Sequence, residues 1–147
     1  MPRIDFYLMQ EKESKIRLNF ACRIVEKAYR NKHKIYIHTE YEKDALYIDE
    51  LLWTFKLDSF LPHNLIGEGP EPAPPIQIGF QQKPDKQHDI LINLSNNVPD
   101  FYKKFTRVIE LVNLDEEIQK RSREHYKLYR ADGFQITTHK LAKLQDA

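Results

Sequence analysis

The chain has 147 residues, the size of one domain, and we expect a single α/β domain over residues 1–147. Hydrophobic residues make up 41% and charged residues 31%, a balance typical of a folded protein and not of a disordered chain. The formal net charge is only +1, so attraction to an acidic partner requires locally clustered cations. The sequence has no apolar run near the length of about 20 residues that a membrane helix needs. It also lacks a secretory signal pattern at its N-terminus, so we expect a cytoplasmic protein.

The first half of the chain predicts two successive βα units. β-branched and aromatic residues at 4–9 predict a strand, and apolar residues at helical spacing over 16–28 predict the helix that follows. A second strand is predicted over 33–39 and a second helix over 41–53. Cys22 lies on the apolar side of the first helix, which predicts a buried thiol and not a nucleophile.

The middle of the chain predicts a long loop and then further strands. Residues 58–75 hold five of the eight prolines and two of the four glycines, which predicts an extended surface loop. Short strands are predicted at 76–80 and 89–95. A short helix near 100–105 then leads into a strand at 107–113.

The last predicted helix runs from about residue 115 to 132. Asp115 is a candidate N-cap, and Gly133 suits the end of the helix because glycine adopts the left-handed conformation without a steric cost. Residues 138–147 are a candidate flexible tail. Strands that alternate with helices predict an α/β fold, a mostly parallel twisted sheet with helices on both faces. The topology would be Rossmann-like without a nucleotide motif.

The proline-rich loop holds the candidate catalytic residues. Gly67 and Gly69 match neither the dinucleotide-binding fingerprint nor a P-loop. His63 and Glu68 could form an acid–base pair in a small nucleotide-handling enzyme, although no nucleophile or third orienting group accompanies them. The stronger explanation is structural, with His63 bonding loop backbone groups and Glu68 a solvated carboxylate. The six histidines show no metal-ligand spacing and are expected at the surface or at strand ends, so we expect no catalytic residue, metal or cofactor.

The C-terminal helix carries a concentration of cations. Between residues 119 and 130, five basic residues oppose one acid, a local charge of 5 − 1 = +4. Four polar positions fall within about 80° of one another around the helix: Gln119, Arg123, Lys127 and Arg130. Tyr126 lies at the edge of this stripe, and Phe134 after the helix end could fold back to give an apolar floor. Tyr129 is expected in the core.

Three interpretations of this basic stripe remain open. Most charge runs are solvated helix faces. An apolar pocket ringed by lysine and arginine also matches an acidic peptide terminus that ends in a hydrophobic side chain. Single-stranded DNA would use similar residues through stacking and phosphate pairing, although one compact stripe is short for that task.

A second candidate surface lies in residues 51–65, where large apolar side chains surround a predicted helix end: Leu52, Trp53, Phe55, Leu57, Phe60 and Leu61. They either cap the core or form a partner-binding patch, because tryptophan and phenylalanine are enriched in interface anchors.

Five collinear segments resemble the chi subunit of bacterial DNA polymerase III holoenzyme. The segments are FYL at 6–8, DELLWTF at 49–55, SFLPHNLIGEGP at 59–70, DILINLS at 89–95 and REHYKLYRADGF at 123–134. The resemblance covers nearly the whole chain. It implies a non-catalytic accessory of the clamp loader that pairs with the psi subunit and contacts the acidic C-terminal tail of single-stranded DNA-binding protein, so that DNA is reached only indirectly.

The resemblance also implies which residues make these contacts. The positions that match the tail pocket are Val112, Arg123, Tyr126, Lys127, Arg130, Gly133 and Phe134. The cations would hold the carboxylates of the tail, and Tyr126 and Phe134 its terminal ring. Trp53 and Phe60 match the psi-facing surface. The chain departs from the family at Gln119, where the pocket can carry a lysine.

Overall fold

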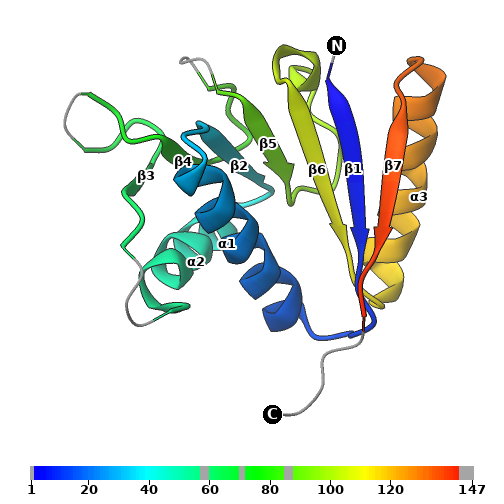
Figure 1. The fold of residues 1–147 in the computed structure, drawn as a ribbon, viewed down its shortest axis with the longest axis horizontal. Helices are drawn as coiled ribbons and strands as arrows, with labels where there is room; N and C mark the ends of the chain where they lie inside the picture. Colours follow the sequence, from blue (N-terminus) through cyan, green and yellow to red (C-terminus); the bar gives the residue numbers. More distant parts are fainter. Residues whose placement is uncertain (1, 57–59, 70–71, 85–87, 143–147) are drawn as a thin grey trace.

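The computed structural model describes residues 2–56, 60–69, 72–84 and 88–142 (Figure 1). Its strands are β1 (Arg3–Leu8), β2 (Ile35–Thr39), β3 (His63–Leu65), β4 (Ile76–Phe80), β5 (Ile90–Asn93), β6 (Arg107–Val112) and β7 (Ile136–Lys140). Its helices are α1 (Ser14–Arg30), α2 (Glu42–Thr54), the short 3₁₀ helix η1 (Tyr102–Lys104) and α3 (Glu116–Ala131).

The strands form one sheet in the order β3-β4-β2-β5-β6-β1-β7, and every neighbouring pair is parallel. In Figure 1, α1 and α2 lie in front of the left half of the sheet, and α3 runs beside the β6, β1 and β7 side. The predicted α/β class with a parallel sheet is confirmed. All strands therefore present their carboxyl ends at one edge, where ligands of such sheets usually bind.

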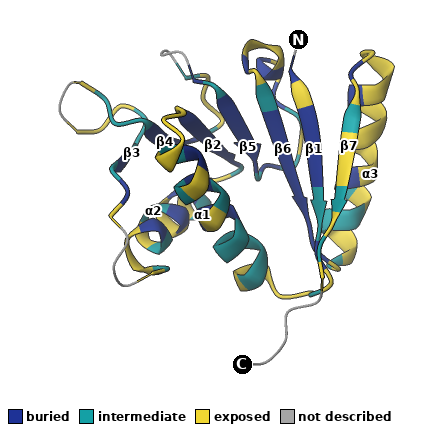
Figure 2. Ribbon diagram, viewed as in Figure 1, coloured by how far each residue is buried: buried dark blue, intermediate teal, exposed yellow. Residues whose placement is uncertain are grey.

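Helices cover both faces of the sheet, each over its own apolar core. Side chains along a strand alternate between faces. In β6, Ile109 and Leu111 pack with α1 and α2, whereas Val108 and Val112 pack with α3 and η1. The inner strands are accordingly buried along nearly their whole length, as Figure 2 shows. We call the two faces the α1 face and the α3 face.

The ends of α3 form as the sequence predicts. The Asp115 carboxylate accepts a hydrogen bond of 3.1 Å from the backbone N–H of Ile118, which caps the first turn. Gly133 has φ +86°, the left-handed conformation that ends a helix. Tyr129 is fully buried, as expected.

Two strands differ from the prediction. β3 lies inside the segment predicted as a loop, where three residues pair with β4. β7 occupies part of the candidate tail: residues 138–140 pair with β1, so a flexible tail beginning at residue 138 is wrong. β7 is an edge strand of sequence ITTHK, and its mostly exposed polar residues lack the apolar run that marks a buried strand. Residues 143–147 lie outside the described residues.

The single cysteine is buried as predicted. Cys22 is 1% exposed within the α1 core, and this burial raises the pKa of its thiol to about 12. The thiol therefore stays protonated at neutral pH, and the thiolate form that reacts is suppressed.

Candidate functional site

The exposed side of α3 carries the predicted cations. Arg123, Lys127 and Arg130 are all exposed, whereas the opposite side of the helix is buried at His125 and Tyr129. Among the described residues, no carboxylate forms an ion pair with any of the three cations. Their charges are therefore available to a ligand.

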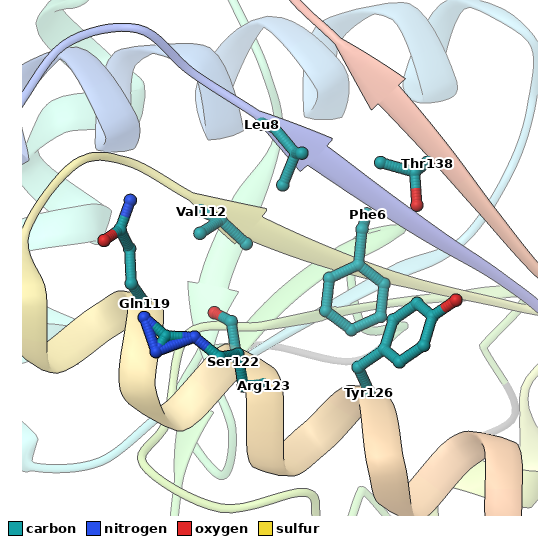
Figure 3. Close-up of a pocket in the computed structure, with 8 residues that line it drawn as sticks. All are labelled: Phe6, Leu8, Val112, Gln119, Ser122, Arg123, Tyr126 and Thr138. Atoms are coloured by element: carbon teal, nitrogen blue, oxygen red, sulfur yellow. The ribbon is translucent and has the colours of Figure 1, made fainter.

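A groove of about 330 Å³ lies between α3 and the sheet, and we call it the α3 groove (Figure 3). It is lined by Phe6, Leu8, Val112, Gln119, Ser122, Arg123, Tyr126 and Thr138. The sheet contributes an apolar floor, with the Phe6 ring against Tyr126 at 5.5 Å between centroids in an edge-to-face contact. In Figure 3, Leu8 and Val112 stand beside these rings, and Gln119 and Arg123 project from α3. The groove thus joins an apolar surface to a cation.

The structure brings some of the predicted site residues into this groove and leaves others outside it. Val112, Arg123 and Tyr126 line it. Lys127 and Arg130 lie along the exposed side of α3 beyond the lining. Gly133 ends the helix.

Phe134 lies deeper than its proposed role requires. It is 9% exposed, and its ring packs against Tyr102 at 5.5 Å between centroids. Its backbone N–H donates to the carbonyl of Tyr129, so the residue does fold back against the helix end. It does so as part of the core beneath α3 and does not line the groove.

Sequence reasoning missed the floor of the groove. Phe6 and Leu8 come from β1 and Thr138 from β7, and no local pattern joins these segments to α3. The alternation along β1 was a usable signal, because Ile4, Phe6 and Leu8 point to the same face. Which helix covers that face depends on the strand order.

A buried polar network beneath α3 fixes the helix. The Glu110 carboxylate is 3% exposed and accepts hydrogen bonds from Asn93 Nδ2 at 2.9 Å and Tyr129 Oη at 2.6 Å. It also lies 3.0 Å from Nδ1 of His125, whose Nε2 is 2.8 Å from the carbonyl of Asn96. Burial alone lowers the pKa of His125, but the bond and charge of Glu110 outweigh it and raise that pKa above its ordinary value. The network ties α3 to β5 and β6.

A second network holds β7, the far rim of the groove. The buried Asp5 carboxylate is bonded by Arg3 at 2.9 Å, Arg107 at 2.7 Å and His139 at 2.8 Å. The His139 ring also stacks on Tyr7 at 4.4 Å between centroids. Burial raises the pKa of Asp5, yet the hydrogen bonds of His139, Arg107 and Arg3 prevail and lower it below the ordinary value. Asp5 therefore stays ionised and ties β7 to β1.

The second predicted surface is also exposed. Trp53 is 44% and Phe60 is 70% exposed, and their rings lie 5.5 Å apart between centroids. Leu52 and Leu61 are in the core, and Leu57 lies outside the described residues. Trp53 and Phe60 together form an aromatic patch at the end of α2.

His63 packs behind this patch and is not placed beside Glu68. Its ring lies 4.3 Å from that of Trp53, and its Nε2 is 3.0 Å from the carbonyl and 3.3 Å from the carboxylate of Asp49. Glu68 is exposed, and its backbone N–H donates to Leu65. The geometry favours the structural explanation of His63 over the acid–base pair.

The described residues lack two other kinds of feature. They contain no group of three or more His, Cys, Asp or Glu side chains placed to hold a metal ion. None of their helices has the length and apolar character required to cross a bilayer.

Comparison with known proteins agrees with the resemblance over nearly the whole chain. A family model described as DNA polymerase III chi subunit, HolC, matches residues 1–137. DNA polymerase III subunit chi of Pseudomonas aeruginosa is 35% identical over 144 residues, which cover 98% of this chain and 100% of that protein. The subunits chi of Escherichia coli K12 and Haemophilus influenzae are each 36% identical, over 94% and 91% of this chain and 97% and 94% of their own lengths. The chain therefore belongs to the family of the bacterial DNA polymerase III chi subunit.

Proposed function

We propose that this chain is a non-catalytic adaptor of the bacterial replisome in the cytoplasm. It links the clamp loader, through the psi subunit, to the acidic C-terminal tail of single-stranded DNA-binding protein. The observation that carries the proposal is the α3 groove, an apolar floor beside exposed cations that have no carboxylate partner among the described residues. A peptide end with carboxylates and a terminal aromatic ring presents both complementary features.

In this proposal each residue of the tail site has a part. The terminal ring would enter between Val112, Tyr126, Phe6 and Leu8, where aromatic and aliphatic surface is concentrated. Arg123 at the groove, followed by Lys127 and Arg130 along the helix, would hold the carboxylates. Gly133 and Phe134 support this site by fixing the end of α3.

Charge removal should weaken binding of a peptide that copies the acidic, phenylalanine-ended tail. We expect Arg123→Ala and Lys127→Ala each to weaken it about tenfold, because each removes a charge-assisted hydrogen bond, and Arg130→Glu to weaken it further. Gln119→Lys should strengthen it severalfold by adding a cation to the lining. Isothermal titration of the full chain measures these affinities, which should also fall with added salt.

The matched control is Lys120→Ala, which removes an exposed cation on another side of the same helix and should leave peptide affinity unchanged. A peptide with an amidated C-terminus should bind less tightly than the free acid. If Arg123→Ala and Lys127→Ala bind the peptide as well as the parent does, the tail site is wrong. Peptide-independent binding of single-stranded DNA that is lost in the same variants would instead favour direct DNA binding by α3.

The aromatic patch is the proposed psi-binding surface. Phe60→Ala should reduce affinity for psi about thirtyfold, the loss of roughly 2 kcal/mol that is typical of a buried interface anchor. Trp53→Ala should act in the same direction. Co-purification with psi and titration of the purified pair measure the effect. Leu114→Ala removes an apolar side chain elsewhere that is about as exposed as Trp53, and it serves as the control. If Phe60→Ala loses psi and tail binding together, general unfolding explains it and the assignment fails.

A further inference from the structure

A second cavity lies at the carboxyl edge of the sheet, apart from the α3 groove and the aromatic patch. Its volume is about 370 Å³, within the range of small-molecule sites. Its polar and charged lining residues are Ser14, Arg17, Thr39, Glu40, Tyr41, Lys43, Asp44, Tyr47, Asn96 and Arg121. We call it the switch crevice, because it lies where the connections that follow neighbouring strands change from one face of the sheet to the other.

The crevice opens between the ends of two neighbouring strands whose connections leave on opposite faces. β2 continues into α2, which packs on the α1 face, and β5 continues towards η1, which packs on the α3 face. The two connections meet where the Asn96 backbone N–H donates to Glu40 Oε1 at 2.8 Å. Figure 1 shows β2 and β5 side by side. Such a reversal of direction is the place where open parallel sheets bind ligands.

Cations converge on this crevice from three helices. Arg17 comes from α1, Lys43 from α2 and Arg121 from α3. Arg17 Nε donates to the carbonyl of Leu111 at 2.9 Å, which orients the guanidinium. Among the described residues, none of the three cations forms an ion pair.

The two acids of the crevice are already engaged by the backbone. Glu40 accepts from Asn96, and Asp44 accepts from the N–H of Tyr41 at 3.2 Å. Burial lowers the pKa of Arg17, and repulsion by Arg121 adds to this effect although Glu110 and Asp115 oppose it. Two guanidinium groups that repel each other in a partly enclosed site are stabilised by an anion between them.

The crevice also offers aromatic surface. Tyr41 is 52% and Tyr47 is 49% exposed, and Lys43 Nζ lies 5.6 Å from the centre of the Tyr41 ring. Bases stack on such rings, and arginine binds phosphate bidentately. α1 begins at this site with Ser14, and Glu13 at its N-cap makes no capping hydrogen bond through its side chain.

We propose that the switch crevice binds the phosphate of a nucleotide, with Arg17 and Arg121 on the phosphate and Tyr41 or Tyr47 on the base. The phosphate is held by side chains, so this mode of binding needs no glycine-rich loop. The nucleotide is either free or the phosphorylated end of a DNA strand, since both present the same group. This site is independent of the proposed tail-binding function.

The test is a titration of the full chain, labelled with ¹⁵N, followed by NMR. Deoxyadenosine monophosphate should shift the amide signals of residues 39–44 and of Asn96. Arg121→Gln and Lys43→Gln should each weaken binding, Arg121→Gln at least about tenfold because it loses a bidentate contact. Lys120→Gln, the adjacent exposed cation outside the crevice, should bind like the parent. Arg17 is left intact because its bond to Leu111 supports the fold.

Further titrations distinguish a free nucleotide from a DNA end, and they can overturn the proposal. Inorganic phosphate should compete weakly, and deoxyadenosine without phosphate should not bind. A short oligonucleotide with a terminal phosphate that binds more tightly than the monophosphate identifies a DNA end, and the reverse order identifies a free nucleotide. The proposal fails if the nucleotide leaves the crevice signals unchanged at millimolar concentration. It also fails if Arg121→Gln binds like the parent, or if the acidic tail peptide shifts these signals and the nucleotide does not.

Discussion

Replacing Glu110 with alanine is expected to lower the free energy of unfolding by about 3 to 5 kcal/mol, the largest loss of stability among the changes considered. Glu110 is the shared acceptor of Asn93, His125 and Tyr129, all of which are buried. Without it, three buried polar groups lose their hydrogen-bond partner. Because water cannot replace that partner inside the protein, each group retains the full free-energy penalty of its desolvation. Urea denaturation at neutral pH measures the change.

The same variant should alter the pH dependence of stability. The raised pKa of His125 means that its contribution is fully present below the unfolded pKa of about 6.5 and is lost as the pH rises through the folded pKa. Glu110→Ala should abolish this slope and also weaken tail binding, because α3 is no longer fixed beside the groove. Glu124→Ala removes an exposed carboxylate of α3 and should change stability by less than about 0.5 kcal/mol. Equal urea midpoints for Glu110→Ala and the parent would contradict the network.

Asp5→Asn should cost about 2 to 4 kcal/mol at neutral pH, because it removes the charge that three cationic or polar partners share. The loss is smaller than at Glu110, since Arg3, Arg107 and His139 are partly exposed and can regain water. β7 should loosen first, so amide exchange at Thr138 and His139 should quicken more than in β6. Hydrogen exchange read by NMR tests this local effect.

Acid should reduce the difference between Asp5→Asn and the parent. The pKa of Asp5 is lowered in the folded protein, so its stabilisation is present above the unfolded value of about 3.9 and is lost as the pH falls through the folded pKa. Urea midpoints at neutral and acid pH should therefore converge. Asp100→Asn, at an exposed carboxylate, should show neither effect. A constant difference across this range would show that Asp5 does not act through its charge.

Local patterns predicted the helices and inner strands well because they depend on neighbours in the sequence. The Asp115 cap and the Gly133 stop were both predicted, since each requires only a side chain or a backbone conformation within one turn. β7 was missed because edge strands carry few apolar residues.

The histidines show the limit of this local information. They were expected at the surface or at strand ends. His63 does begin β3, but His125 is buried in the middle of α3. For His125 the reason is Glu110, fifteen residues away in the sequence, which compensates its burial. A partner at that distance leaves no periodic signal.

The sequence by itself determined that Arg123, Lys127 and Arg130 share one side of a helix, because the helical repeat follows from spacing alone. Only the tertiary structure decided what lies beside them. β1 sits between β6 and β7, which places Phe6 and Leu8 beneath α3. The pairing of β1 with β6 also brings together the helices that follow these strands, α1 with Arg17 and α3 with Arg121, at one crevice. Strand order depends on which distant segments bury their apolar faces together and on how the connections between strands run. A single helix or strand does not encode either of these.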